Sequence, residues 1–193
     1  DASLGYFLTP MITVIFGFFF LNEKLNINKV ISVILMFIAS LIIFLSQGNF
    51  PFISILIGAT WAVYGLLRKQ IKVSPATGLL YESGLITIFA LPYLIYLSFI
   101  DIGYISITFN FTTIMLILTG AVTIFPLFFF NLGLKYIPLG LAGVLFYIAP
   151  SFHFITSLFV LNEYIEFEKI IAFILIWIGV AIFIYDVMKK KII

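Results

Sequence analysis

The side chains in this sequence that could do chemistry are few and widely spaced. The 193 residues include a single histidine, His153, and no cysteine. Among the carboxylates, Glu82 lies deepest within an apolar stretch. An enzyme brings a nucleophile, a base and an electrophile together in one site, and a chain without cysteine has no thiolate nucleophile or thiolate metal ligand. These residues do not assemble into such a site, so the sequence predicts no enzyme, no metal and no cofactor.

Glu82 and His153 are candidates instead for contact with a solute or for carrying a proton. A charged group inside an apolar segment is costly, and by default it marks a function. Glu82 is seven residues past Pro75, where its segment begins, which is ~10 Å along a helix. Structural alternatives stand beside both assignments. Glu82 could reach back to the membrane surface or pair with Arg68, and His153 could be a hydrogen-bonded packing residue.

The elements that must position these residues are membrane-spanning helices. Hydrophobic residues make up 64% of the chain and charged residues 9%, whereas a soluble domain carries about 25% charge. A helix that crosses a bilayer needs about 20 mostly apolar residues. The sequence therefore predicts an all-α membrane protein, a helical bundle with seven visible transmembrane helices. The expected spans are residues 3–21, 29–46, 51–67, 75–98, 111–134, 139–161 and 168–187.

The basic residues outside the apolar runs fall almost entirely on one side of the predicted membrane. That side receives Lys24, Lys29, Arg68, Lys69, Lys72, Lys135, Lys189, Lys190 and Lys191. The other side receives Lys169 together with the acidic residues Asp1, Asp101, Glu163, Glu166 and Glu168. Cytoplasmic loops carry the excess of Lys and Arg. The sequence therefore predicts a cytoplasmic C-terminus and a visible N-terminus on the outer side.

One apolar sequence pattern of 14 residues occurs twice in the chain. "PMITVIFGFFFLNE" occupies residues 10–23 and "PSFHFITSLFVLNE" occupies residues 150–163. The offset of 140 residues continues without a gap to about residue 46 and aligns Lys29 with Lys169. From the first copy to the second is a step of five spans, an odd number, so the copies cross the membrane in opposite directions. This is an inverted-topology repeat, which many secondary transporters contain.

The repeat also predicts how the chain is divided. Residues 1–47 are expected to be the last two helices of a first repeat, residues 51–188 a complete five-helix second repeat, and residues 189–193 a basic cytoplasmic tail. The chain is accordingly expected to be the C-terminal two-thirds of a ten-helix, 5+5 inverted-repeat protein with three helices upstream. The paired Glu23 and Glu163 lie at hairpins on opposite faces. Each precedes a helix start, where a carboxylate suits the helix dipole, so both are interpreted as structural.

The repeat adds candidates for a cavity between its two halves. Thr13 aligns with His153, and Tyr6 and Tyr147 lie three to four residues before the paired prolines. Tyr64 is a further candidate, although an aromatic residue near the cytoplasmic face can also serve as an anchor at the membrane surface. Prolines inside the predicted spans free backbone carbonyls and kink the helix. The expected hinges are Pro10, Pro92, Pro126 and Pro150.

Six segments resemble one group of transporters. They are "ASLGYFLTP" (2–10), "VYGLLRK" (63–69), "TGLLYES" (77–83), "AVTIFPLFFF" (121–130), "IPLGLAGVLFYIAP" (137–150) and "ILIWIGVAIFIYD" (174–186). In this order they resemble the RarD group of the EamA branch of the drug/metabolite transporter superfamily over essentially the whole chain. The group's "TG…E" pattern falls on Thr77, Gly78 and Glu82. The chain departs from the group in lacking its first three helices and in having His153 where an amide or a thioether is expected.

The resemblance implies a membrane transporter in the bacterial inner membrane. Its expected activity is export of small metabolites or drugs, such as chloramphenicol-like compounds or amino-acid-like metabolites, by alternating access. The expected partners are the solute, a coupled proton, the lipid bilayer, the three upstream helices of the same protein and a second copy in a homodimer, and not nucleic acid. The alternative from another class is a non-transporting membrane interaction protein, in effect a truncated subunit.

Overall fold

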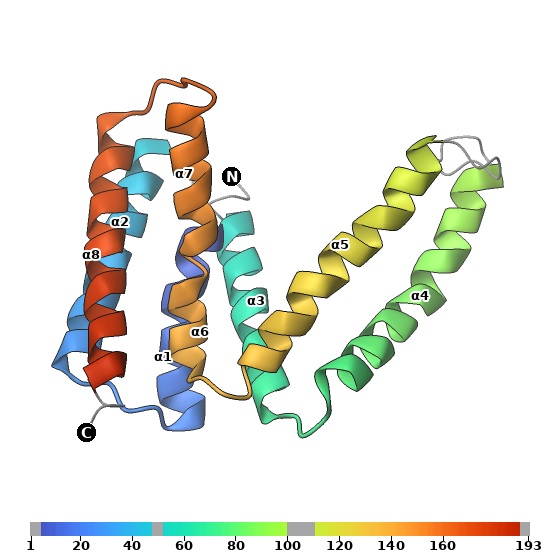
Figure 1. Ribbon diagram of the computed structural model, residues 1–193, viewed down its shortest axis with the longest axis horizontal. Helices are drawn as coiled ribbons and strands as arrows, with labels where there is room; N and C mark the ends of the chain where they lie inside the picture. Colours follow the sequence, from blue (N-terminus) through green and yellow to red (C-terminus); the bar gives the residue numbers. More distant parts are fainter. Residues whose placement is uncertain (1–4, 48–51, 100–110, 190–193) are drawn as a thin grey trace. The chain divides into compact units, whose positions relative to one another are not determined.

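The computed structural model describes the backbone of residues 5–47, 52–99 and 111–189 and the side chains of residues 7–46, 52–99 and 111–189. Every regular element in these ranges is an α-helix, and they contain no β-strand. The helices are α1 (Gly5–Leu21), α2 (Ile27–Gln47), α3 (Phe52–Gln70), α4 (Pro75–Phe99), α5 (Phe111–Gly133), α6 (Leu139–Leu145), α7 (Ile148–Phe159) and α8 (Phe167–Lys189) (Figure 1). The prediction of an all-helical protein is confirmed for this part of the chain.

Six helical stretches in the described ranges are long and apolar enough to cross a membrane. They are Ile27–Ser46, Phe52–Gln70, Pro75–Phe99, Phe111–Gly133, Leu139–Phe159 and Phe167–Lys189. The first predicted span corresponds to α1, which has 17 residues and is therefore slightly shorter than the length of about 20 that a bilayer requires. These helices make the chain a multi-pass membrane protein.

The sixth predicted span, residues 139–161, is interrupted rather than continuous. α6 ends at Leu145 and α7 begins at Ile148. Between them, the amides of Phe146 and Tyr147 donate to carbonyls three residues back, at 3.0 and 3.1 Å, which is the tighter turn of a 3₁₀-helix. Pro150 has no N–H to donate to the carbonyl four residues before it. The loss of that bond favours the break at this point of the span.

Contacts divide the chain into two units, and each is described by itself. Unit 1 comprises Asp1–Gln70 and Tyr136–Ile193, and unit 2 comprises Ile71–Lys135. In unit 2, α4 and α5 contact each other, and each contains a proline, Pro92 or Pro126. Most of the large apolar side chains of these two helices are exposed. Such surfaces suit lipid or further helices, since a membrane helix gains nothing from hiding apolar groups from lipid.

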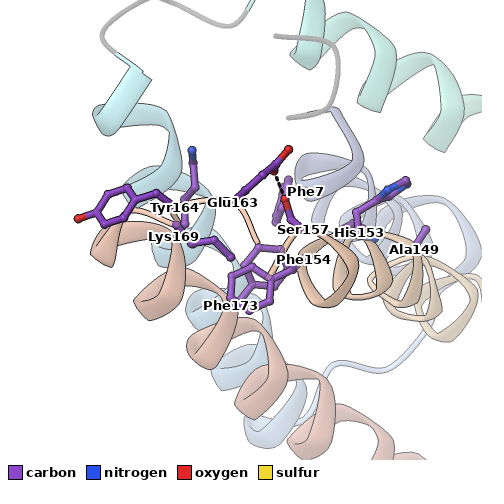
Figure 2. A pocket seen from close by; sticks show the side chains of 11 residues that line it. Phe7, Ala149, His153, Phe154, Ser157, Glu163, Tyr164, Lys169 and Phe173 are labelled. Carbon is purple, nitrogen blue, oxygen red and sulfur yellow. Dashed lines mark hydrogen bonds between the residues drawn. The ribbon is translucent and has the colours of Figure 1, made fainter. Parts of the chain in front are cut away.

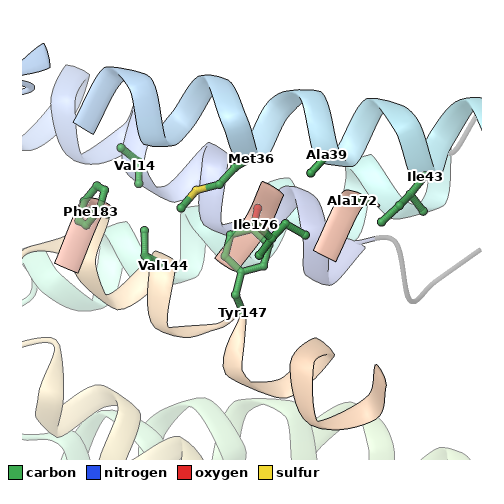
Figure 3. Packing of buried hydrophobic residues seen from close by; sticks show 9 residues of the cluster. All are labelled: Val14, Met36, Ala39, Ile43, Val144, Tyr147, Ala172, Ile176 and Phe183. Carbon is green, nitrogen blue, oxygen red and sulfur yellow. The ribbon is translucent and has the colours of Figure 1, made fainter. Parts of the chain in front are cut away.

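Unit 1 is held together by α2 packed on α8 and by α1 packed on α3 and α6. The buried cluster at its centre consists of Val14, Met36, Ala39, Ile43, Val144, Tyr147, Ala172, Ile176 and Phe183 (Figure 3). Small residues allow the helices to approach closely. At Gly179 of α8, an added Cβ would lie 3.1 Å from the carbonyl oxygen of Ser32 on α2, which is the small-residue packing common between membrane helices.

The buried positions of α2 and α8 recur at the offset of 140 residues. Ser32, Met36, Ala39 and Ile43 of α2 correspond to Ala172, Ile176, Gly179 and Phe183 of α8, and all eight are buried. The two helices therefore pack on each other through equivalent faces.

The hairpins α1–α2 and α7–α8 lie at opposite ends of unit 1 (Figure 1). Each begins with an asparagine in the left-handed conformation, Asn22 with φ 53° and Asn162 with φ 51°, which is a common way to end a helix. In each, the following glutamate amide donates six residues back. The Glu23 amide donates to the Gly17 carbonyl at 3.1 Å and the Glu163 amide to the Ser157 carbonyl at 3.0 Å. The two turns have the same backbone geometry.

Candidate functional site

A cavity of about 520 Å³ lies at the α7–α8 end of unit 1 (Figure 2). It is lined by Phe7, Ala149, Pro150, His153, Phe154, Ser157, Glu163, Tyr164, Ile165, Lys169 and Phe173. Solute sites are typically concave and mostly apolar, with a few polar groups that fix orientation. The cavity has this composition, and its lining includes two predicted site residues, the candidate solute contact His153 and the expected hinge Pro150.

Helix periodicity and one turn place the polar groups on the same cavity. Pro150, His153 and Ser157 are three and four residues apart, so they lie along one face of α7. The turn after α7 adds Glu163, and the first turn of α8 adds Lys169. The polar wall therefore comes from two adjacent helices and the hairpin that joins them.

Aromatic rings form the apolar part of the cavity wall. Phe154 of α7 lies 4.3 Å from Phe173 of α8 between ring centroids. Phe7 of α1 meets Phe173 edge-on at 5.5 Å. Figure 2 shows these rings grouped together, with the Ser157–Glu163 hydrogen bond to one side. A flat apolar or aromatic group of a solute would find matching contacts here.

The charged groups of the cavity have partners within the protein. The Ser157 hydroxyl donates to the Glu163 carboxylate, and the Lys169 ammonium lies 3.1 Å from the Glu166 carboxylate. The ring of His153 is exposed and makes no hydrogen bond to the residues that the structure describes. His153 is therefore a polar side chain that is available to a solute in this cavity.

The opposite end of unit 1 is closed at the equivalent positions. Thr13, which aligns with His153, is 3% exposed and donates to the Thr9 carbonyl at 2.6 Å. An added Cβ at Gly143 of α6 would lie 2.7 Å from the Cβ of Thr13. α6 therefore fills the space beside Thr13.

Glu23 holds the closed end together. Its two carboxylate oxygens accept the amides of Leu139 at 2.5 Å and Gly140 at 3.0 Å, at the start of α6. The Lys69 ammonium donates to the Ile137 carbonyl at 2.6 Å in the same region. The sequence interpretation placed the Glu23 carboxylate near the start of its own next helix. The structure shows instead that it binds a helix more than a hundred residues away in the chain.

The other predicted site residues lie apart from the cavity or outside the described side chains. Tyr147 is 2% exposed, and its hydroxyl donates to the Phe7 carbonyl at 2.8 Å. Tyr64 packs on Trp61, with ring centroids 5.4 Å apart. Glu82 is half-buried on α4, in unit 2. The side chain of Tyr6 lies outside the described ones.

The expected hinge prolines all lie within helices. Pro10 is in α1, Pro92 in α4 and Pro126 in α5, and Pro150 is in the first turn of α7. Their role as hinges stays a prediction.

Sequence reasoning missed a buried carboxylate at the closed end. Asp186 of α8 is 4% exposed and accepts hydrogen bonds from the side-chain amides of Asn26 and Asn28. The Asn26 side-chain oxygen in turn accepts the Lys29 amide at 3.1 Å, which caps the start of α2. The signal was present, because Asp186 is the one acid within the apolar part of the last predicted span. The cluster ties α2 to α8.

Comparison with known proteins gives consistent matches. The model of the EamA-like transporter family matches residues 1–45 and 50–185. The uncharacterized transporter YojE of Bacillus subtilis is 32% identical over 99% of this chain and 63% of its own length. Protein RarD of Streptomyces exfoliatus is 30% identical over 98% of this chain and 60% of its own length. Chloramphenicol-sensitive protein RarD of Pseudomonas aeruginosa is 25% identical over 96% and 62%, respectively. The chain thus spans 60–63% of the length of these relatives.

Proposed function

The chain belongs to the EamA-like transporter family, and from this premise we propose that the protein exports small metabolites or drugs across a bacterial inner membrane by alternating access. The observation that carries the proposal is the cavity of about 520 Å³ at the α7–α8 end of unit 1. Its wall is mostly apolar and includes a few polar side chains, among them the exposed His153. A solute site in a transporter would have this composition.

Three observations support a ten-helix, 5+5 inverted repeat as the architecture of the whole protein. The hairpins α1–α2 and α7–α8 have the same turn geometry at opposite ends of unit 1. The buried faces of α2 and α8 recur at the same offset. The family match falls into residues 1–45 and 50–185, close to the division that the repeat predicts. The relatives' greater length leaves room for three upstream helices.

The solute class follows from the chemistry of the cavity wall. The phenylalanine rings favour a flat apolar group, and His153 can donate or accept a hydrogen bond. Small amphipathic molecules with an aromatic or branched apolar part fit this wall, and chloramphenicol-like compounds and apolar amino acids are examples. The name of the Pseudomonas aeruginosa relative supports chloramphenicol as a first compound to test. The orientation of the basic residues supports a cavity on the outer side.

Export from cells tests the proposal. The full reading frame is expressed in bacteria, and accumulation of labelled chloramphenicol and of apolar amino acids is measured. Expression should lower accumulation of at least one compound, and His153→Met should weaken the effect because it removes both hydrogen-bonding nitrogens. Gly120→Ala is the control, because an added Cβ there meets no atom within 4 Å. Unchanged accumulation of every compound by the intact, membrane-inserted protein would refute the proposal.

The 193-residue chain should be tested beside the full reading frame. Reconstituted alone, it is expected not to move solute, since the walls supplied by the upstream helices would be missing. Transport by the 193 residues alone would contradict the ten-helix part of the proposal.

A further inference from the structure

A second cavity lies beside the candidate solute cavity, on the other face of α7. This apolar cavity has a volume of about 290 Å³, and its wall consists mostly of apolar side chains from α6, α7 and α8, among them Ile155 and Trp177. The solute cavity uses instead the face of α7 that carries His153 and Phe154, and no described residue lines both cavities. Side chains of α7 and α8 therefore separate the two cavities.

Trp177 forms the boundary between the two cavities where α7 meets α8. Its indole lines the apolar cavity and contacts two phenylalanines of the solute cavity's wall. The ring centroid of Trp177 lies 5.9 Å from that of Phe154, edge-on, and 6.0 Å from that of Phe173. Phe154 and Phe173 therefore have the solute cavity on one side and the indole on the other. A flat solute that reached these two rings could go no further toward the apolar cavity without displacing Trp177.

The position of Trp177 is unusual for a membrane protein. Trp177 lies midway along α8, whereas tryptophans concentrate at the ends of membrane spans, where the indole N–H meets water. At mid-span the N–H needs a partner within the protein. It donates to the Ser151 hydroxyl oxygen at 2.9 Å, and the Ser151 hydroxyl donates in turn to the Tyr147 carbonyl at 2.7 Å. The indole is thus fixed to α7 beside the helix break.

We propose that Trp177 is a specificity-determining residue, a partition that sets how long an apolar group the solute cavity accepts. Ser151 is a positioning residue, because its hydroxyl holds the indole in place. With the indole present, the apolar part of a solute ends at Phe154 and Phe173. Without the indole, these two rings lose the surface against which they pack, and the solute cavity can extend toward the apolar cavity. This inference rests on the proposed function, because it assigns a limit to the proposed solute site.

Binding of two amino acids that differ by one aromatic ring tests the partition. Phenylalanine and biphenylalanine are each titrated by equilibrium dialysis against the purified full-length protein in mixed detergent micelles. In the wild type, the second ring of biphenylalanine finds no apolar space and should bring no gain in affinity. In Trp177→Ala, the ratio of the phenylalanine Kd to the biphenylalanine Kd should rise at least about tenfold, since even one extra methylene in an apolar pocket is worth about that much.

Milder substitutions keep the test decisive if Trp177→Ala does not fold. Trp177→Phe keeps one ring without the N–H and should raise the ratio less than Trp177→Ala. Ser151→Ala removes the acceptor of the indole N–H and should raise the ratio about threefold, the effect of losing one neutral hydrogen bond. Phe152→Ala is the matched control, because Phe152 lines the apolar cavity but takes no part in the described ring contacts of Phe154 and Phe173. Its ratio should equal that of the wild type.

The ratio separates a partition from a purely structural role, because general destabilisation weakens the binding of both amino acids alike. An unchanged ratio in the folded variants of Trp177 and Ser151 overturns the inference, and so does an equal rise in Phe152→Ala. Export by the wild type together with an unchanged ratio removes only the partition and leaves the proposed function standing. A raised ratio in a protein that exports neither compound upholds the partition and counts against export. If neither amino acid binds to any of the proteins, the partition and the proposed solute class are both wrong.

Discussion

Gly143 provides a sharp test of the contact between α1 and α6. In Gly143→Ala the new Cβ would lie 2.7 Å from the Cβ of Thr13 and 3.1 Å from the carbonyl oxygen of Pro10. Neither atom can move by a side-chain rotation, because one is a Cβ and the other is backbone. The two helices must therefore separate, and the closed end of unit 1 must loosen.

The expected size of this effect follows from two opposing contributions. Overpacking a tight contact costs about 1–3 kcal/mol, and the backbone contacts here place Gly143→Ala in the upper half of that range. Exchanging Gly for Ala in a helix returns about 1 kcal/mol. The net loss of unfolding free energy should be about 1–2 kcal/mol. At Gly84, where an added Cβ meets no atom within 4 Å, the same exchange should stabilise by about 1 kcal/mol.

Equilibrium unfolding of the purified full-length variants in mixed detergent micelles measures both values. The two variants should differ by about 2–3 kcal/mol in opposite directions from the wild type. Gly143→Ala should also raise the thiol reactivity of a cysteine at position 13. If Gly143→Ala is as stable as Gly84→Ala, the close approach of α1 and α6 is wrong, and the closed end does not exist as described.

Substitutions at three further positions test other parts of the structure. Tyr147→Phe removes the bond to the Phe7 carbonyl and should cost about 0.5–1.5 kcal/mol of unfolding free energy in the same micelle assay; no loss would mean that the bond is not formed. Asp186→Ala leaves the Asn26 and Asn28 amides without their acceptor and should cost about 1–3 kcal/mol, whereas Asp186→Asn should cost less, and equal losses would contradict the hydrogen-bond assignment. Glu82→Gln should remove the pH dependence of export while leaving expression unchanged, and export with an unaltered pH profile would exclude Glu82 as the proton carrier.

The sequence predicted the helices well because their signal is a long apolar run. The described helices fall within a few residues of the expected spans, and the equivalence of the "PMITVIFGFFFLNE" and "PSFHFITSLFVLNE" frames extends to the φ angles of Asn22 and Asn162. The break at Phe146–Tyr147 was not predicted. A proline inside a membrane helix can produce a kink or an interruption, and neighbouring helices decide which.

The contacts of the polar residues were harder to predict because they depend on tertiary packing. Nothing near Glu23 in the sequence indicates that its partners are the amides of Leu139 and Gly140. The burial of Thr13 likewise follows from α6, which packs against it. A repeat in the sequence predicts which positions are equivalent, but only the structure shows which residues contact each of them.

The hydrogen bond between the Tyr147 hydroxyl and the Phe7 carbonyl joins two residues that are themselves equivalent, since their numbers differ by 140. The bond ties the turn between α6 and α7 to the backbone of α1. Any movement of α7 about the break at Phe146–Tyr147 must therefore either break this hydrogen bond or carry α1 with it.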